Sequence, residues 1–234
     1  MSHEKNIVLV TGAGRGIGEQ AARLFLERGC RVLALDKDFS ACKLPQAAQR
    51  IRFDLQDPAG IPALVAGLGD IDVLVNNAAT LYCHPHDGFP EAHALEILAV
   101  NLRAPVALIE ALAPQMRRRK AGRIINVASV AAFTGHPDLW YGASKAALLN
   151  ITKSYASYLG PDGILVSAVA PGPTLTAMYD KLPQSRKDAV MRSVHSGRIC
   201  SPEEVAQAIV WLGTESPPYM SGATLDVNNG AYPR

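Results

Sequence analysis

Three polar side chains in the middle of the chain could together move a proton to or from an oxygen bound to carbon. Tyr141 and Lys145 are four residues apart, so on a helix they would share one face, and Ser129 lies twelve residues upstream of Tyr141. A phenol has an ordinary pKa of about 10, and a fixed cation nearby favours its charged form. We therefore expect Lys145 to lower the pKa of Tyr141, which would act as general acid or base while Ser129 holds the substrate oxygen.

A pair of this spacing is weak evidence when it stands alone, because a tyrosine and a lysine can simply share the exposed face of a helix. The N-terminal part of the chain makes the chemical interpretation the better one. Residues 7–10 are a short β-branched run typical of a buried parallel strand. Apolar residues between 21 and 26 then give a helix one apolar face, and a glycine-rich turn at 11–18 joins the two elements.

This glycine-rich turn is suited to binding the pyrophosphate of a dinucleotide. Glycine allows a sharp turn and a close approach of the backbone, and the start of the following helix attracts phosphate charge. The spacing of its glycines is not G-x-G-x-x-G, so the evidence is the strand–turn–helix context rather than the motif. The residues expected to contact the cofactor here are Gly12, Arg15, Gly16, Ile17 and Gly18.

Asp36 ends the second expected strand, residues 31–35, and lies 18 residues after Gly18. A carboxylate at this place accepts hydrogen bonds from the adenosine ribose and repels a 2′-phosphate, so it favours NAD. Arg15 and Lys37 are cations of the kind that accept a 2′-phosphate, which keeps NADP as the alternative cofactor. An ordinary aspartate that starts a turn is the structural alternative for Asp36.

At this point the chain resembles a known family, the short-chain dehydrogenase/reductase superfamily, over nearly its whole length. The motifs appear in the family's order: the 11–18 loop, Asp54, Asn76-Asn77-Ala78, Asn101, Ser129, Tyr141-x-x-x-Lys145, and Pro171-Gly172 followed by Thr174 and Thr176. Within the family, the chain is most similar to 3-oxoacyl-carrier-protein reductases and to sugar or alcohol dehydrogenases. Two departures are a Gly replaced by Ala79, and a short 38–49 stretch with Pro45 that predicts a stunted helix.

The resemblance implies a role for each matching position. Tyr141 would be the acid in reduction and the base in oxidation, Lys145 would also bind the nicotinamide ribose, and Ser129 would polarise the substrate oxygen. Asn101 would hold a water that links Lys145 to solvent; a helix cap or kink residue is its structural alternative. Besides Tyr141 and Lys145, the cofactor would be lined by residues that follow the strands: Asp36, Asp54, Leu55, Asn76, Ala78, Pro171, Gly172, Thr174 and Thr176.

Composition is that of an ordinary globular protein. The 234 residues are 48% hydrophobic and 19% charged, and a net charge of +2 provides no general attraction for nucleic acid or anionic membrane. The one basic run, residues 117–120, follows a helical stretch and is expected to be a solvated helix end. The polar N-terminus does not resemble a signal peptide, and no apolar run is long enough for a membrane span.

Cysteine and histidine usage predicts no metal centre and a reducing compartment, the cytoplasm. The four cysteines show neither metal nor redox spacing. The run His84-Pro85-His86-Asp87 lacks the second pair of ligands that a structural metal site needs. We therefore expect no metal in the site.

Strand and helix signals alternate along the chain. Further strands are expected at 51–54, 73–75, 124–127, 164–169 and 224–227, and helices at 58–68, 91–98, 102–116, 141–159 and 202–212. This alternation predicts a single α/β domain over residues 1–234, a doubly wound Rossmann-type parallel sheet of about seven strands with helices on both faces. Ligands of such sheets bind beyond the C-terminal ends of the strands.

These features predict an NAD(H)-dependent oxidoreductase acting on a small secondary alcohol or ketone. Two alternatives stay open: an NADPH-dependent 3-oxoacyl-thioester reductase, and a dinucleotide-binding regulator, which would need no proton donor. The segment 173–200 is expected to form a mobile lid over the substrate, with Ala131, His136 and Trp140 as pocket residues. The long helices resemble those that pair across two-fold axes in this family, so we expect a homotetramer.

Overall fold

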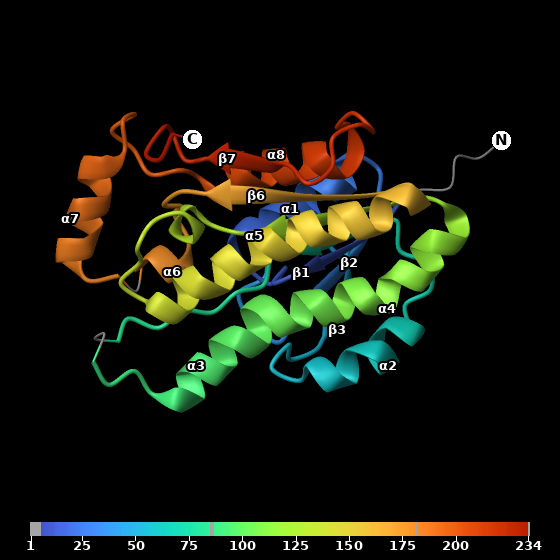
Figure 1. Ribbon diagram of the computed structural model, residues 1–234, viewed down its shortest axis with the longest axis horizontal. Coiled ribbons are helices and arrows are strands. Elements are labelled where there is room, and N and C mark those ends of the chain that lie inside the picture. Colours follow the sequence, from blue (N-terminus) through green and yellow to red (C-terminus); the bar gives the residue numbers. More distant parts are fainter. Residues whose placement is uncertain (1–5, 85–86, 181, 234) are drawn as a thin grey trace.

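The computed structural model describes residues 6–84, 87–180 and 182–233, and its centre is a parallel β-sheet (Figure 1). In these residues seven strands pair in the order β3-β2-β1-β4-β5-β6-β7, and every pairing is parallel. The strands are β1 Ile7–Thr11, β2 Arg31–Asp36, β3 Gln49–Arg52, β4 Val73–Asn76, β5 Gly122–Val127, β6 Ile164–Pro171 and β7 Thr224–Val227. The predicted doubly wound α/β fold is confirmed.

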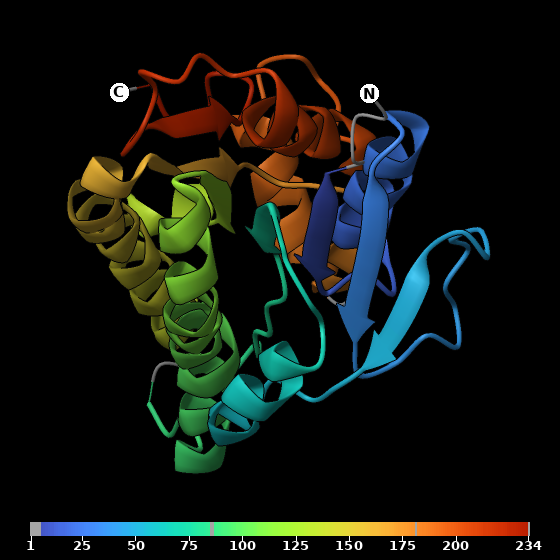
Figure 2. The same cartoon turned by 90° about the vertical axis from the view of Figure 1, so that its right-hand side faces the viewer.

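Helices cover both faces of this sheet (Figure 2). One face carries α1 (Gly16–Glu27) and α8 (Pro202–Thr214), which pack against each other. The opposite face carries α2 (Ile61–Ala66), α4 (Ala104–Arg119) and α5 (Leu139–Leu159), and α3 (Glu91–Leu98) leads into α4 through a π-helical turn at Ala99–Arg103. Two short helices, α6 (Ala177–Asp180) and α7 (Gln184–Ser193), lie outside these layers (Figure 1).

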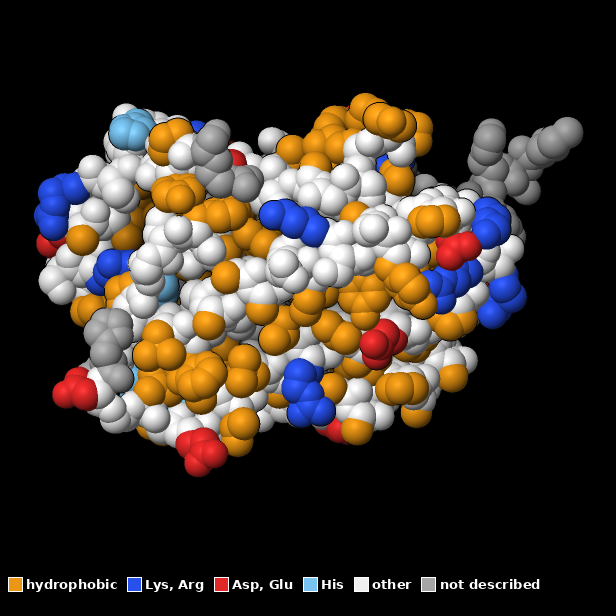
Figure 3. Space-filling model, in the orientation of Figure 1, with side chains coloured by type: hydrophobic (Ala, Val, Ile, Leu, Met, Phe, Trp, Pro, Cys, Tyr) orange, Lys and Arg blue, Asp and Glu red, His pale blue; other side chains and the backbone are white. Residues whose placement is uncertain are grey.

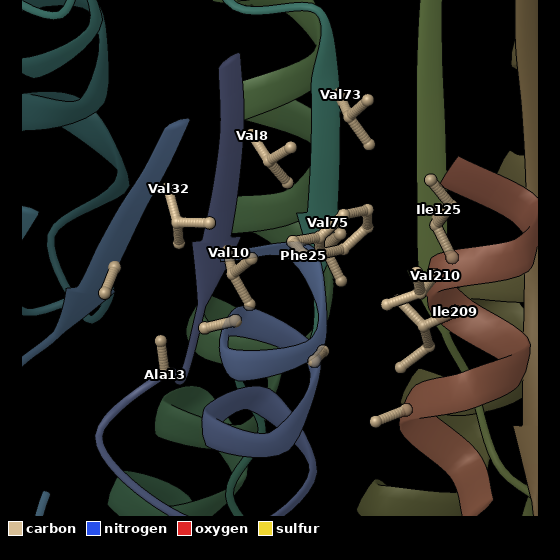
Figure 4. Packing of buried hydrophobic residues seen from close by; sticks show 14 of the residues in the cluster. Val8, Val10, Ala13, Phe25, Val32, Val73, Val75, Ile125, Ile209 and Val210 are labelled. Atoms are coloured by element: carbon tan, nitrogen blue, oxygen red, sulfur yellow. The ribbon is translucent and has the colours of Figure 1, made fainter. Parts of the chain in front are cut away.

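The alternation of side chains along each strand separates two apolar clusters. Val8 and Val10 of β1 point to the α1–α8 face, where they join Phe25 and Ile209 (Figure 4). Leu9, between them, belongs to the cluster beneath α2 and α4. Because both faces of the sheet are buried, its strands read as continuous apolar runs, and burial of these side chains is the main force that stabilises the fold.

Most expected elements occur within a few residues of their predicted bounds, and the differences have physical causes. The third strand is 49–52 rather than 51–54, and the expected helix 58–68 begins as a 3₁₀ turn, Pro58–Gly60, before α2. α4 continues through Pro114 to Arg119, because its apolar face is held on the sheet. The stretch 38–48, for which a stunted helix was expected, contains no helix at all. Two helices were not predicted: α6, which is only four residues long, and α7, whose charged sequence has no helical apolar stripe.

Residues of the basic run 117–120 form ion pairs with carboxylates of the same chain. Arg117 and Lys120 pair with Asp162, at 2.9 and 2.6 Å, and Arg119 lies 3.2 Å from a carboxylate oxygen of Asp70. These ion pairs fasten the C-terminal end of α4 to the turns before β4 and β6. The expectation of a helix end rather than a nucleic-acid surface agrees with this arrangement.

Thr11 is the last residue of β1, the strand from which the sheet extends in both directions. β1 pairs with β2 on one side and β4 on the other, and such a switch point opens a crevice at the C-terminal ends of the strands. The buried Thr11 hydroxyl donates to the Val75 carbonyl (3.2 Å) and accepts from the N–H groups of Asn77 (3.0 Å) and Ala78 (3.1 Å). One side chain therefore positions the loop after β4 against the end of β1.

We predict that Thr11→Val lowers the free energy of unfolding by about 1–3 kcal/mol, because the isosteric side chain leaves buried N–H groups without their acceptor. Urea unfolding of both proteins at equal concentration measures this difference. Thr214→Val is the control: its hydroxyl donates only to Val210 one turn earlier in α8, and a change below about 0.5 kcal/mol is expected. Equal effects of the two variants would contradict the role of Thr11.

Candidate active site

The glycine-rich loop between β1 and α1 is shaped by crowding at its glycines. Gly12 has a φ of 66°, which glycine adopts without strain. A Cβ at Gly14 would lie 2.3 Å from the Asp38 carbonyl oxygen, and one at Gly18 would lie 2.2 Å from the Gly12 oxygen. Helix α1 begins after Arg15 without a side-chain cap on its first N–H groups, which leaves them for a phosphate.

Asp36 is held at the end of β2 by this loop. One carboxylate oxygen accepts the Gly14 N–H (2.8 Å) and the other accepts the Asp38 N–H (3.0 Å). The carboxylate therefore has a fixed place beside the glycine loop. Arg15 contributes to a lowered pKa of the neighbouring Asp38 carboxyl, so this cation lies on the same side of the crevice, although hydrogen bonds from Ser40 are the main cause.

The other predicted residues of the adenosine side lie next to Asp36. Lys37 turns toward Asp54, with 4.0 Å between its ammonium and a carboxylate oxygen, and both side chains are about half exposed. Asp54 also accepts the Gln56 N–H (3.0 Å). Leu55 is buried in the core beneath them. The strand ends thus bring these positions together, as the family resemblance implies.

Asn76 and Asn77, adjacent in sequence, point to different surroundings. The Asn76 amide is buried and donates to Asn126 (2.9 Å), while its oxygen has no hydrogen-bond partner in the described structure. The Asn77 amide donates to the Thr11 and Gly12 carbonyls, at 2.9 and 3.2 Å. Asn77, which the sequence analysis quoted in a motif but did not choose as a cofactor residue, therefore supports the glycine loop directly. The backbone N–H groups of Asn77 and Ala78 both donate to the Thr11 hydroxyl.

Ser129, Tyr141 and Lys145 come together at the end of β5 and the start of α5. The Ser129 hydroxyl lies close enough to the Tyr141 phenol to act on its pKa. The Ser129 hydroxyl also accepts the Ala131 N–H (3.1 Å), which holds it at the start of a 3₁₀ turn. Lys145 is 2% exposed; its ammonium donates to the Val127 carbonyl (2.7 Å) and lies 5.7 Å from the centre of the Tyr141 ring.

The expected lowering of the Tyr141 pKa by Lys145 is wrong for this arrangement. Burial raises the pKa of Tyr141, and the nearby Ser129 hydroxyl opposes that shift without reversing it. Burial also lowers the pKa of Lys145 from 10.5 to about 7. A lysine that is only partly charged at neutral pH and directed at a backbone carbonyl cannot stabilise the phenolate as a full, fixed cation would.

Asn101 lies in the π-helical turn between α3 and α4 and is fully buried. Its amide oxygen accepts the Thr80 N–H (2.8 Å), and its nitrogen donates to the Thr80 carbonyl (2.9 Å) and the Ser144 hydroxyl (3.1 Å). The side chain thus anchors the loop after β4 to α5. A water between Lys145 and solvent stays a prediction, and with the Asn101 amide engaged it would need a backbone group as partner.

The residues after β6 lie over the glycine loop. Pro171 ends β6, and Gly172 donates its N–H to Val227 (2.9 Å). Thr174 donates to the Gly172 carbonyl (3.0 Å), and the Thr176 methyl group is 3.3 Å from the place a Cβ would take at Gly16, in the first turn of α1 beside Ile17. The glycine-rich loop and the 171–176 segment therefore form two walls of one crevice.

The two ends of the segment expected to form a lid, residues 173–200, are paired with each other. Thr174 and Cys200 form an isolated parallel bridge, and Leu175 donates its N–H to the Cys200 carbonyl (2.9 Å). The segment between them carries α6 and α7 as a closed loop (Figure 1). Lys181 lies outside the described residues.

Asp138 is a functional position that the sequence analysis missed. It is 2% exposed, and its carboxylate accepts the Tyr141 N–H (3.0 Å) at the start of α5 and the Tyr82 N–H (2.7 Å) from the loop after β4. An aspartate before an apolar helical run is the standard sequence signal of a helix N-cap and could have identified it. Its bond to the Tyr82 N–H could not be predicted in this way, because Tyr82 is distant in the sequence.

Comparison with known proteins places this crevice in a family. The family model described as enoyl-(acyl carrier protein) reductase matches residues 12–232. Over 242 aligned positions and 99% of each chain, the protein is 33% identical to the 3-oxoacyl-[acyl-carrier-protein] reductase of Vibrio cholerae. It is 34% identical to galactitol 2-dehydrogenase of Agrobacterium fabrum, again over 99% of each chain.

Solved structures agree with this assignment. An NAD(P)-dependent gluconate 5-dehydrogenase from Beutenbergia cavernae, with bound NADP, superposes with a TM-score of 0.91 at 30% identity over 98% of both chains. A 3-ketoacyl-(acyl-carrier-protein) reductase from Brucella melitensis, complexed with NADH, gives a TM-score of 0.89 at 28% identity over 97% of this chain and 98% of the other. The chain belongs to the short-chain dehydrogenase/reductase family. It is an NAD(P)-dependent oxidoreductase.

The dinucleotide of this reductase family fits the residues present. The glycine loop excludes side chains where a pyrophosphate must approach, the start of α1 lacks a side-chain cap, and the Asp36 carboxylate stands at the end of β2. When bound, the cofactor supplies the hydride chemistry. The protein contributes the crevice and the groups that hold and move a proton.

Among the described residues, no group of three His, Cys, Asp or Glu side chains could hold a metal ion, and Pro85 and His86 of the histidine run lie outside those residues. The helices of the described ranges include none with the length and apolar character needed to cross a membrane.

The buried Lys145 leads to a prediction about stability and pH. Its folded-state pKa of about 7 lies below its ordinary 10.5, so between these values the unfolded chain binds more protons and stability rises with pH. Lys145→Met removes this contribution. We expect the variant to be more stable than wild type near pH 7, with an advantage that shrinks by about 1.4 kcal/mol per pH unit toward pH 10.

Urea unfolding between pH 6.5 and 9.5 measures this change. Lys153→Met, at an exposed position of the same helix, is the matched control and should keep a nearly constant difference from wild type. A difference between wild type and Lys145→Met that does not vary with pH would contradict the depressed pKa of Lys145.

Proposed function

We propose that this reductase transfers a hydride between NAD(H) and a secondary alcohol or ketone, with Tyr141 as the acid in reduction and the base in oxidation. The observation that carries the proposal is the grouping of Ser129, Tyr141 and Lys145 at the C-terminal edge of the sheet, where the Lys145 ammonium lies 5.7 Å from the centre of the Tyr141 ring. Ser129 holds the substrate oxygen, Tyr141 exchanges its proton, and Lys145 binds the nicotinamide ribose. A regulator without turnover would need no proton donor.

We propose the remaining positions as the cofactor wall, because they line the same crevice. The pyrophosphate side consists of the loop and its facing segment: Gly12, Arg15, Gly16, Ile17, Gly18, Pro171, Gly172, Thr174 and Thr176. The adenosine and ribose side consists of residues that follow β2, β3 and β4: Asp36, Asp54, Leu55, Asn76 and Ala78. Asn101 acts behind Lys145 by fixing α5.

Tyr141→Phe tests the proton transfer. The variant keeps the ring but loses the proton, so we expect the turnover rate to fall by at least ~100-fold while cofactor affinity changes little. Steady-state kinetics and a fluorescence titration with NADH measure the two effects. Tyr219→Phe, at a fully exposed position, is the control and should retain wild-type rates. Turnover of Tyr141→Phe at the wild-type rate would remove Tyr141 from the mechanism.

We further propose that NAD(H) is preferred over NADP(H). The support is that Asp36 is fixed at the end of β2 by two backbone N–H groups, while Lys37 is directed toward Asp54. A 2′-phosphate would face the carboxylate before it met a cation. The NADPH-dependent 3-oxoacyl-thioester reductase is the alternative, favoured by the similarity to the Vibrio cholerae protein.

Asp36→Ala should raise the ratio of NADP(H) to NAD(H) efficiency by about 10-fold or more, since the repulsion disappears while Arg15 and Lys37 remain. The ratio is the readout, because loss of the Gly14 bond lowers activity with both cofactors. Asp57→Ala, which alters only the cap of a 3₁₀ turn, should leave the ratio unchanged. Wild-type protein that binds NADPH more tightly than NADH would show that Asp36 does not select the cofactor.

We also propose that the chain acts as a cytoplasmic homotetramer. The four cysteines are free, which suits a reducing compartment. Helices α4 and α5 lie side by side on an outer face (Figure 1), and apolar side chains gather over α3, α4 and α5 there (Figure 3). Leu95 is 59% and Tyr158 is 65% exposed on these helices. β7 is an edge strand, which a second two-fold contact would cover.

Light scattering at micromolar concentration tests the assembly. Two kinds of two-fold contact close into a tetramer, so the mass should be about four times the 24.9 kDa of one chain. A mass of one chain would rule out both contacts, and a mass of two chains would leave one of them.

A further inference from the structure

His136 is seated directly against the proposed proton donor. Its ring centre is 5.2 Å from that of Tyr141, and the two planes are inclined by 50°. A Cβ on Gly142 would lie only 3.1 Å from the Cβ of His136, so the glycine after Tyr141 makes room for this histidine. The imidazole therefore lies beside Ser129 and Tyr141, the place where the reacting oxygen would bind.

One nitrogen of the His136 ring is left for a ligand. Nδ1 lies 3.1 Å from both the backbone N and the backbone O of Asp138, so the chain engages that nitrogen. No hydrogen bond to Nε2 from another described group is seen. When Nδ1 accepts the Asp138 N–H, Nε2 carries the proton and becomes a donor. Burial, with a further contribution from Arg186, lowers the pKa of His136, so the ring is neutral at pH 7.

The Lys and Arg side chains of the 173–200 segment differ in whether they contact other groups of the chain. Lys187 donates to the Asp180 carbonyl (3.1 Å) and lies over the Tyr179 ring. Arg198 forms two hydrogen bonds to the Glu204 carboxylate. Arg192 is exposed. Arg186 is half-buried, acts electrostatically on His136, and forms no ion pair with any side chain in the described ranges.

These observations place a guanidinium without an ion-pair partner and an imidazole with one unengaged nitrogen on the same side of the crevice. Lys and Arg side chains also gather at the end of the molecule where α7 lies (Figures 1 and 3). Arginine binds a carboxylate through two parallel N–H groups, and a neutral imidazole adds a donor without further charge repulsion. Such a pair suits an anion that approaches over Ser129 and Tyr141.

We propose that Arg186 and His136 bind an anionic group of the substrate, so that the substrate is a hydroxy acid or the corresponding oxo acid rather than a neutral alcohol or ketone. This inference rests on the proposed function. It gives α7 a definite role, because the contact of Arg186 with the carboxylate would orient the reacting carbon toward Tyr141. His136 and Arg186 are positioning residues that determine specificity and take no part in proton transfer.

Matched substrate pairs test the proposal, because each pair differs mainly in charge. The first pair is 5-oxo-D-gluconate and L-sorbose, in which a hydroxymethyl group replaces the carboxylate. The second is acetoacetate and its ethyl ester. Wild-type protein with NADH should prefer the carboxylate of at least one pair by about 100-fold or more in kcat/KM. Arg186→Gln should reduce that preference at least ~10-fold, mainly through KM, and Arg192→Gln should leave it unchanged.

His136 is tested by two variants. His136→Gln keeps an N–H donor and should retain part of the preference, whereas His136→Phe keeps a planar ring without a donor and should lose it. Equal efficiency with charged and neutral members of both pairs would overturn the proposal. So would an equal loss on both members in Arg186→Gln, or a preference for the neutral N-acetylcysteamine thioester of acetoacetate, which would favour a thioester reductase.

A binding measurement separates this inference from the proposed function. Trp140 adjoins Tyr141, so its fluorescence should report titration with 5-oxo-D-gluconate in the presence of NADH. We expect affinity to fall at least ~10-fold in Arg186→Gln and to be unchanged in Arg192→Gln. Binding that depends on Arg186 without turnover of any probe would support the anion site and contradict the proposed function. Binding that does not depend on Arg186, or no binding at all, would overturn the anion site.

Discussion

The hydrogen bond from the Lys145 ammonium to the Val127 carbonyl is the contact on which the geometry of this reductase depends. It joins the second turn of α5 to the last residue of β5, and it lies in a dry environment because Lys145 is almost fully buried. Burial of an ammonium is unfavourable, which the lowered pKa of Lys145 expresses. The fold tolerates this cost, and a fixed donor remains beside Tyr141 at the sheet edge.

A second set of buried polar contacts holds the loop after β4 against the same helix. Asp138 accepts N–H groups from both Tyr82 and Tyr141, and Asn101 bonds both Thr80 and Ser144. The loop is therefore attached to α5 at two points that flank Tyr141. Because each contact is buried and specific in direction, loss of either would move the start of α5 relative to Ser129.

The two ends of the crevice carry side chains of opposite charge. At the adenosine end, a carboxylate fixed by the glycine loop faces the incoming cofactor, and the nearby Lys37 is directed to Asp54. At the substrate end, Arg186 lies near a neutral histidine. If the proposed anion site is correct, these two groups would orient a dinucleotide and an acid in a single direction within the crevice.

Much of this reductase was determined by its sequence alone. The β-branched runs and the glycine-rich turn predicted the strands, the order of motifs predicted the family, and the shared helical face predicted that Tyr141 and Lys145 lie together. These features are local, because periodicity and turn chemistry act over a few residues. The expected direction of the Tyr141 pKa shift was wrong, since burial and the partner of Lys145 are not local properties.

The tertiary structure decided what depends on contacts between distant segments. Asp138 was unremarkable in the sequence, and only the fold brings Tyr82 to its carboxylate. Asn77 rather than Asn76 supports the glycine loop, because side chains of successive strand-end residues point in opposite directions. The seat of His136 beside Tyr141, and the approach of Arg186 to it, require α7 to fold back over the sheet edge, which no pattern of neighbouring residues specifies.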